Sequence, residues 1–290
     1  MDKKQMIAET RKIIQDYSRE NHMHTADLLK SLWLKGDVTK SSGLVKKEQR
    51  EKLEFKGIQL DVLKSMGKEI GKEVENADDF LPLAETLWNN YGREGRIVSA
   101  VILGKIVVSD PEKIVPVCKK LVKTAISWED CDNMVEGIEP LIRKEPDVYL
   151  EWLHLWLQDE NKWVRRCCIT VIGRLPMKRP EYTSQCLNMI VPCLTDDDKE
   201  VQRAVSFAIR MGARGNIQAV YTFVRTHAGG LNPGKIWIFS DVIRSMTKKF
   251  IPVFKRLLPV YEEWLHTVDN PQSKRSLQSA ARVLEAGFNG

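Results

Sequence analysis

The segment Lys162-Trp163-Val164-Arg165-Arg166-Cys167-Cys168 opens with polar residues, runs into arginine, and continues with small and apolar residues at helical spacing. Three other segments, 93–98, 199–205 and 272–277, open in the same way, with Arg96, Arg203 and Arg275 in the same register as Arg166. In a further segment Asp132 takes the place of the arginine. From Arg96 to Arg203 this register recurs about 35 to 40 residues apart. That interval is typical of a solenoid built from pairs of helices.

Helical patterns recur in pairs from residue 55 onward, and no segment shows the strict alternation of a β-strand. We therefore predict an all-α protein, a right-handed α-solenoid of HEAT-like helix pairs with a concave basic groove. Prolines beside acidic residues mark helix starts at 111, 146 and 180. The predicted helices span 58–73, 78–91, 94–108, 111–125, 127–143, 147–158, 161–175, 180–194, 198–213, 216–227, 233–248, 250–267 and 272–287.

The same pattern predicts three parts along the chain. Residues 1–54 are expected to form an N-terminal helical cap and a charged loop, since 36–43 is rich in Gly, Ser and Thr and 44–56 is heavily charged. Residues 55–227 form the predicted repeat core, and residues 228–290 a C-terminal helical extension. Because the repeat continues across these boundaries, we expect one continuous superhelix rather than two domains.

Composition narrows the class of protein. A net charge of +6 and a pI near 8.9 permit a nucleic-acid partner without requiring one. The six cysteines form no CxxC pair and have no nearby histidine pairs, which favours reduced, buried thiols over a metal site or disulfides. The first residues lack an apolar targeting segment, and Lys105 interrupts the longest apolar run. We expect a soluble, cytoplasmic monomer with no membrane partner, associated with the nucleoid if the source is bacterial or archaeal.

The repeated helix starts predict a row of positive charge, because residues in equivalent register stack along a solenoid. Such a row suits a phosphate backbone. The aromatic residues Trp128, Trp163 and Phe207 lie on the same predicted helices. The alternative is that each basic residue is an ordinary solvated helix start. The row comprises Arg93, Arg96, Lys162, Arg165, Arg166, Lys199 and Arg203.

The segment 127–135 differs from its neighbours because it carries carboxylates where they carry arginine. Trp128 and Asp132 are four residues apart on a predicted helix, so they share one face. An ionised carboxylate beside an indole could stabilise developing positive charge or orient a water molecule. The alternative is that Asp130 and Asp132 only favour a helix N-terminus, where the helix dipole stabilises anions.

At these residues the sequence resembles the AlkD-like DNA glycosylases, a HEAT-repeat family that excises alkylated bases. The resemblance extends from about residue 55 to 227 and depends on the order and spacing of several motifs. They are Phe55-x-Gly57-Ile58-Gln59, Leu87-Trp88 before Arg93-Glu94, Ser127-Trp128 with Asp132, Asn161-x-Trp163-x-x-Arg166, and Lys199-Glu200 leading to Gln202, Ala204 and Phe207.

The resemblance implies a role for each matching residue. Asp132 would be the catalytic carboxylate, with Trp128 in the aromatic pair around the lesion. Phe207 and Trp163 would be the other lesion-facing aromatic residues, although the family usually has tryptophan at the position of Phe207. Arg166 would hold the DNA backbone near the damaged nucleotide, together with Gln59 and the basic row.

The resemblance also implies the reaction: excision of cationic N-alkylated purines, such as 3-methyladenine or 7-methylguanine, from double-stranded DNA in base excision repair. A cationic base is a good leaving group, so we expect a hydrolase that needs no metal or cofactor. The alternative is a non-catalytic HEAT-repeat module that binds unusual DNA structures or serves as a scaffold for a protein partner.

Overall fold

The computed structural model describes residues 1–36, 56–230 and 232–287, and every regular element in these ranges is helical. The predicted loop at 36–43 and charged segment at 44–56 fall almost entirely outside the described residues. The chain divides into two compact units, Met1–Pro146 (unit 1) and Asp147–Gly290 (unit 2). The boundary lies within the predicted core at 55–227. The three-part division of the chain stays a prediction.

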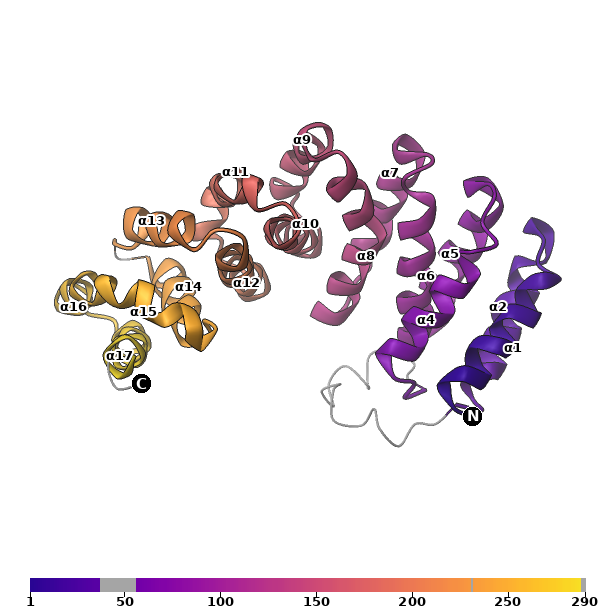
Figure 1. Cartoon of the computed structure of the whole chain (residues 1–290), viewed down its shortest axis with the longest axis horizontal. Helices are drawn as coiled ribbons and strands as arrows, with labels where there is room; N and C mark the ends of the chain where they lie inside the picture. Colours follow the sequence, from indigo (N-terminus) through magenta and orange to yellow (C-terminus); the bar gives the residue numbers. More distant parts are fainter. Residues whose placement is uncertain (37–55, 231, 288–290) are drawn as a thin grey trace. The chain divides into compact units, whose positions relative to one another are not determined.

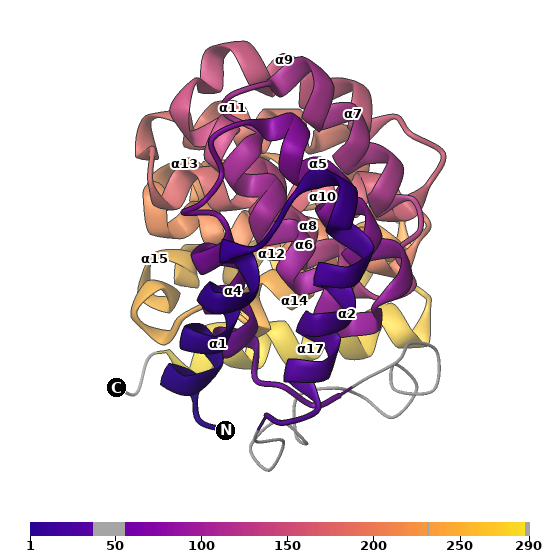
Figure 2. The same cartoon turned by 90° about the vertical axis from the view of Figure 1, so that its right-hand side faces the viewer.

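In unit 1 the helices form two rows. The first row contains α1, α4, α6 and α8, each packed against the next, and the second row contains α2, α5 and α7 (Figure 1). Figure 2 shows α1 and α2 side by side at the start of this unit. The bounds are α1 Lys3–Gln15, α2 His22–Trp33, α4 Leu60–Ile70, α5 Ala77–Asn90, α6 Gly92–Ile106, α7 Pro111–Val122 and α8 Trp128–Lys144. The next helix, α9 (Pro146–Leu157), begins at the last residue of unit 1 and otherwise belongs to unit 2.

Unit 2 repeats this arrangement. Its first row contains α10, α12, α14 and α17, again each packed against the next, and α11 and α13 pair on the other side of α12. The bounds are α10 Lys162–Arg174, α11 Thr183–Met189, α12 Lys199–Gly215, α13 Ile217–His227, α14 Pro233–Arg244, α15 Ile251–Phe254, α16 Leu258–Thr267 and α17 Pro271–Ala286. The prediction of an all-α solenoid of helix pairs is therefore confirmed.

Two predicted helices are broken in the structure. The helix expected at 180–194 is α11 with a 3-10 turn on each side, and the one expected at 250–267 divides into α15 and α16 around further 3-10 turns. Pro192 lies in the turn that follows α11, and Pro252 and Pro259 lie in the second region. Proline has no backbone N–H to donate and its ring clashes with the preceding turn, so a continuous α-helix is disfavoured at each place.

Helices of the first row approach each other closely through glycine. A Cβ atom added to Gly104 of α6 would collide with the carbonyl oxygen of Glu136 on α8. In unit 2 a Cβ on Gly173 of α10 would lie 2.5 Å from the Cα of Ala208 on α12. Backbone-to-backbone contact of this kind fixes how one first-row helix crosses the next.

Some hydrogen bonds between repeats join residues that are separated by the repeat length predicted from sequence. The indole Nε1 of Trp88 donates to Thr124 Oγ1 at 2.9 Å, and these residues are 36 positions apart. In unit 2 the Ser206 hydroxyl donates to Asp241 Oδ2 at 2.6 Å, across 35 positions. All six cysteines are buried free thiols, as predicted.

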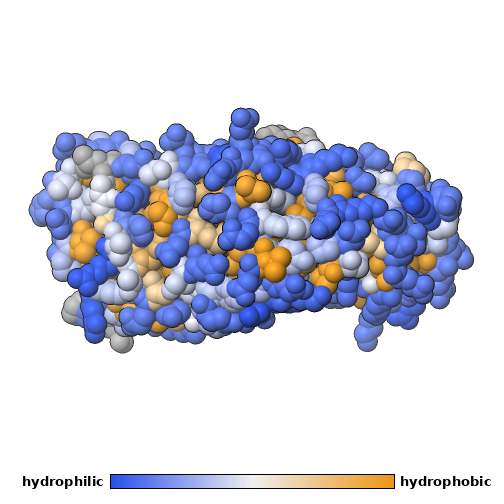
Figure 3. All heavy atoms as spheres, turned by 90° about the horizontal axis from the view of Figure 1, so that it is seen from above, coloured by the Kyte–Doolittle hydropathy of each residue, from blue (hydrophilic) through white to orange (hydrophobic). Residues whose placement is uncertain are grey.

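The surface shown in Figure 3 is mainly hydrophilic. Apolar residues are scattered among the hydrophilic ones. Within the described residues, none of the helices has the length and apolar character needed to cross a membrane.

Candidate nucleic-acid interface

The first turn of α8 carries the two residues to which the sequence assigns chemistry. Ser127 caps the helix by accepting a hydrogen bond from the Asp130 N–H. Trp128, the first residue of α8, keeps 38% of its surface exposed, and Asp132 is half-buried one turn later. Their spacing places the indole and the carboxylate on one face of the helix, as predicted.

Glu129, next to Trp128, is held by Arg93 of α6. The Nε of Arg93 lies 3.0 Å from both carboxylate oxygens of Glu129, and Nη2 lies 2.8 Å from Oε1. The remaining terminal nitrogen, Nη1, donates to the carbonyl oxygen of Ile58 at 3.0 Å. Arg93 is only 5% exposed. Its guanidinium is therefore committed to groups inside unit 1.

Arg96 makes an equivalent contact one turn further along α6. Its Nη1 donates to Asp130 Oδ2 at 2.6 Å, and its guanidinium lies 5.2 Å from the centre of the Trp88 ring. The same Asp130 oxygen accepts the backbone N–H of Ile126 at 3.1 Å. Arg96 is 7% exposed. Both arginines are buried against acids of the next first-row helix, and their role in binding the DNA backbone stays a prediction.

Unit 2 uses the same arrangement between α10 and α12. Arg165 donates to Asp196 at 2.7 Å, and Arg166 donates to the carbonyl oxygen of Glu200 at 2.9 Å and to its Oε2 at 3.2 Å. Arg166 is 7% exposed. Arg165 is half-buried, so neither guanidinium is displayed as a fully solvated charge. The predicted contact of Arg165 and Arg166 with the DNA backbone likewise stays a prediction.

The exposed face of α12 carries an accessible positive charge of the predicted set. Arg203 keeps 52% of its side chain exposed while pairing with Glu200 on the same helix. Phe207 follows one turn later and is half-buried. Arg210 and Arg214 continue the same face at helical spacing, although the sequence analysis did not single them out. The signal was present in the sequence, since both lie three or four residues from the preceding member of this face.

Arg210 is unusual among these cations. Its Nε is buried and has no hydrogen-bond partner. Burial lowers the pKa of the Arg210 guanidinium, and Arg214 lowers it further, whereas Asp241 raises it. An arginine nevertheless remains charged at neutral pH.

The two predicted lysines of unit 2 each lie near an aromatic ring. The ammonium of Lys162 lies 5.0 Å from the centre of the Trp163 ring and 3.3 Å from Asp198 Oδ2. The Lys199 ammonium lies 5.3 Å from the Trp237 ring and donates to a glutamine on its own helix, Gln202. Trp163 is half-buried. These lysines are partly solvated and combine a positive charge with an aromatic face.

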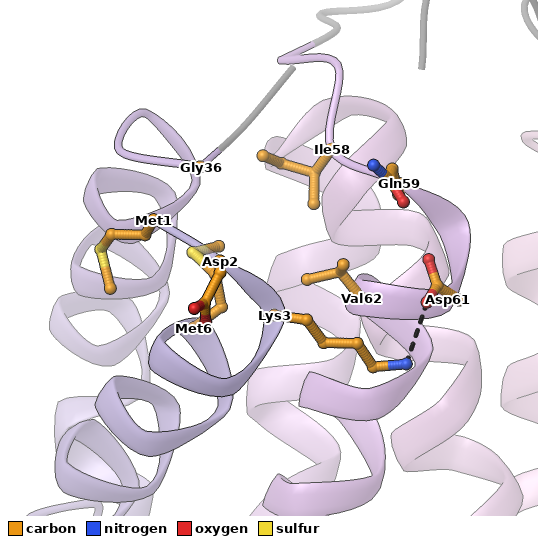
Figure 4. Close-up of a pocket in the computed structure, with 9 residues that line it drawn as sticks. All are labelled: Met1, Asp2, Lys3, Met6, Gly36, Ile58, Gln59, Asp61 and Val62. Atoms are coloured by element: carbon orange, nitrogen blue, oxygen red, sulfur yellow. Dashed lines mark hydrogen bonds and ion pairs between the residues drawn. The ribbon is translucent and has the colours of Figure 1, made fainter. Parts of the chain in front are cut away.

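Gln59, predicted to contact DNA, lies at the N-terminus of α4 in unit 1. It lines a cavity of about 180 Å³ between the starts of α1 and α4 (Figure 4). The same cavity contains an ion pair between Lys3 and Asp61, with the Lys3 ammonium 2.9 Å from Asp61 Oδ2. Gln59 therefore lies beside polar and charged groups of the N-terminal helix.

The segment before Gln59 is fixed by a buried acid of α6. Glu94 Oε1 accepts the backbone N–H groups of Gly57, at 2.9 Å, and Ile58, at 3.3 Å. Gly57 has a positive φ of 86°, which favours glycine. Burial raises the pKa of Glu94, and its Oε2 is buried without a hydrogen-bond partner. Among the described residues, no three His, Cys, Asp or Glu side chains are grouped so that they could hold a metal ion.

Comparison with known proteins indicates the same family as the motifs in the sequence. Residues 37–236 match the family model described as DNA alkylation repair enzyme. The crystal structure of AlkD2 from Streptococcus mutans is similar, with a TM-score of 0.60 and 12% identity, over 78% of this chain and 99% of that one. The structure of smu.31 from Streptococcus mutans UA159 aligns with a TM-score of 0.56 and 14% identity, over 65% of this chain and 93% of that one. At these identities both structures show the fold alone. No curated protein sequence matches the chain.

Proposed function

The chain belongs to the family of DNA alkylation repair enzymes, and from this membership we propose that it is a DNA N-glycosylase. Its substrates are purines that alkylation has made cationic, such as 3-methyladenine and 7-methylguanine, in double-stranded DNA. Removal of the base leaves an abasic site, the intermediate from which base excision repair proceeds.

The observation that carries this proposal is the face of α8 formed by Trp128 and Asp132. The two acids between them, Glu129 and Asp130, bind buried arginines of α6. Asp132 shares its face of α8 with Trp128, which is 38% exposed. A carboxylate and an indole on one face provide negative charge and a π surface, and both favour a nearby cation.

The reaction needs little help with its leaving group. When the bond between the anomeric carbon and the purine nitrogen breaks, the electron pair moves to the base and neutralises its positive charge. The sugar then acquires oxocarbenium character, which the Asp132 carboxylate and the Trp128 ring stabilise. The oxygen of a water molecule bonds to the anomeric carbon, and the proton that this oxygen loses passes to solvent. Because the base leaves without prior protonation, the proposed chemistry requires no general acid, metal or cofactor.

Unit 2 is proposed to contribute contacts of its own to DNA. Arg203 and Arg210 supply charge for phosphates, and Lys162 and Lys199 add partly solvated ammonium groups. Trp163 and Phe207 are the aromatic residues proposed to stack on bases. Arg166 pairs with Glu200 of α12 and Arg165 with Asp196 in the turn before it, so both are proposed to hold the start of that helix and to contribute little to DNA binding.

The experiment is replacement of the carboxylate, Asp132→Asn, which removes one charge and retains the size of the side chain. Release of 7-methylguanine from methylated duplex DNA should fall by roughly ten- to a thousandfold, the effect of losing about 1.4 to 4 kcal/mol of transition-state stabilisation. Affinity for undamaged DNA should change little. The matched control is Glu112→Gln, which removes an exposed carboxylate from α7 and should retain full activity.

Salt dependence separates the remaining outcomes. The affinity of the wild-type protein for DNA should fall steeply with rising salt if phosphates are bound. Wild-type protein that binds DNA in this manner but releases no base would be a non-catalytic DNA-binding module. If the protein fails to bind DNA even at low salt, it is neither a glycosylase nor a DNA-binding module. A scaffold for a protein partner would then be the remaining function.

A further inference from the structure

Two buried arginines of α6 point into the first turn of α8, where the proposed catalytic residues lie. We infer that Arg93 and Arg96 are positioning residues, which orient Trp128 and Asp132 through their ion pairs with Glu129 and Asp130. This inference rests on the proposed function, because it assigns a purpose to the turn that carries the proposed chemistry. It replaces phosphate binding as the role of both arginines.

The Arg93 contact constrains orientation as well as distance. Both Nε and Nη2 donate to Glu129, so the planar guanidinium meets the planar carboxylate in a two-point contact. Glu129 directly follows Trp128 in the chain. Holding the Glu129 side chain therefore limits rotation of the helix start that carries the indole.

The Arg96 contact fixes the same turn from a second point. Asp130 receives the guanidinium at 2.6 Å and the Ile126 N–H at 3.1 Å on one oxygen, so the residue is tied both to α6 and to the loop before α8. Arg96 is itself stacked on Trp88, whose indole donates to Thr124 in that loop. Asp132 lies two residues beyond Asp130. Its backbone position is consequently set by a network that begins on α5 and α6.

Stability alone does not account for these buried charges. Transfer of two ions from water into a protein interior is costly, and apolar residues of similar volume often stabilise a fold as well or better. Arg96 also leaves its buried Nε without an acceptor, which adds a further cost. Apolar contacts, however, do not specify direction, whereas a reacting carboxylate must be held within about 0.5 Å of its productive place. Directional ion pairs meet that need.

The network also reaches the segment before α4. Arg93 Nη1 donates to the Ile58 carbonyl oxygen, and Glu94 accepts the N–H groups of Gly57 and Ile58. The adjacent residues Arg93 and Glu94 thus bind both the segment before Gln59 and the first turn of α8 after Trp128. Positioning of the catalytic turn depends on α6 as a whole rather than on one bond.

The test is Arg96→Lys and Arg93→Lys, which keep the charge but lose the planar fork. For each, kcat for release of 7-methylguanine should fall about tenfold, whereas KM and DNA affinity stay within about twofold. In the Asp132→Asn background the same substitutions should lower the remaining rate less than about twofold, because a residue that acts through Asp132 has nothing left to position. Equal losses in both backgrounds would overturn the inference. So would a rise in KM at constant kcat, which is the signature of a phosphate contact.

A second measurement is independent of activity. Hydrogen exchange of the amides at 128–132 should speed up in both variants and stay unchanged in Arg11→Lys, which alters an ion pair with the buried Glu69 on α4. The control should also retain wild-type kcat. Should the wild-type protein release no base, the proposed function fails, yet faster exchange at 128–132 would still support the positioning of this turn and unchanged exchange would overturn it. If a lysine variant does not fold, Asp130→Asn, which can still accept the Ile126 N–H, serves in its place.

Discussion

Helix α8 of unit 1 and helix α12 of unit 2 are fastened to the preceding first-row helix by the same device and present opposite chemistry on their exposed faces. Each receives arginines of the preceding helix at its N-terminal end: Arg96 reaches Asp130 across 34 positions, and Arg166 reaches Glu200 across 34 positions. Beyond these contacts α8 presents an indole and a carboxylate, whereas α12 presents Arg203, a phenyl ring and two further arginines. The buried contact is common to the repeats, and the exposed face is where the repeats differ.

The difference explains why an arginine in the repeated register is a poor guide to DNA contact. Those at the starts of α6 and α10 are used within the protein to join consecutive helices. The more accessible cations are Lys199, Arg203 and Arg214 on α12 and, in part, Lys162 at the start of α10. In α6 and α10 the register arginine therefore marks a contact between consecutive first-row helices, and the departure from the register at Asp132 marks the site for which we propose the chemistry.

The contrast between buried and exposed arginines would be wrong if replacing either kind changed the free energy of unfolding by the same amount. Arg96→Met should lower the free energy of unfolding by about 3 to 5 kcal/mol, because it leaves the Asp130 carboxylate buried without its ion partner. Arg203→Met, at an exposed pair, should change it by at most about 1 kcal/mol. Urea unfolding of the two variants measures both values. The double variant Arg96→Met with Asp130→Leu should regain part of the loss, and a double variant no better than the single would show that charge pairing was not the cause.

The exposed face of α12 can be tested by its salt dependence. If Arg203 and Arg210 each neutralise one phosphate, then Arg203→Ala and Arg210→Ala should each reduce the slope of log affinity against log salt by about one unit. Binding should weaken similarly for all DNA sequences, since phosphates carry no sequence information. Fluorescence anisotropy over a series of salt concentrations provides the slopes. An unaltered slope for Arg210→Ala would mean that Arg210 does not contact a phosphate.

The smallest expected effect concerns the buried acid that accompanies Arg93. Because burial raises the pKa of Glu94 above its ordinary value of 4.5, the folded protein binds this proton more tightly than the unfolded chain does. The stability that Glu94 contributes is fully present below that ordinary value and is lost as pH rises through the folded pKa. Glu94→Gln removes this titration and can still accept the N–H groups of Gly57 and Ile58.

The Tm of Glu94→Gln relative to wild type should therefore increase by a few degrees between about pH 4 and pH 8. Differential scanning calorimetry across that range measures the difference. A Tm difference that stays constant with pH would show that Glu94 does not titrate in this window.

Much of the fold could be predicted from sequence, because periodicity and repeat length depend on local patterns. The predicted helix at 127–143 corresponds to α8, and the one at 198–213 to α12. The exceptions follow from Pro192, Pro252 and Pro259, which interrupt patterns that otherwise look helical. The division into two compact units has no local signal, because it depends on packing between distant residues.

The candidate site was predictable only in part. The shared face of Trp128 and Asp132 follows from a spacing of four residues, which a sequence displays directly. The burial of Arg93 and Arg96 does not, because it depends on acids about one repeat downstream. Glu129 and Asp130 were visible in the sequence as helix-start acids, but nothing local indicated that α6 would reach them. Comparing charges at an interval of 34 to 36 residues would have revealed both pairs.

The order of these pairs has a consequence for the way the protein is made. Each buried arginine precedes its acid in the chain, so a ribosome delivers the cation first and the anion one repeat later. At about 5 to 20 residues per second, the stretch from Arg93 to Glu129 takes about 2 to 7 s to synthesise. During that interval a nascent α6 cannot bury Arg96 against its acid partner. We therefore expect α6 to complete its packing only after the start of α8 has been synthesised.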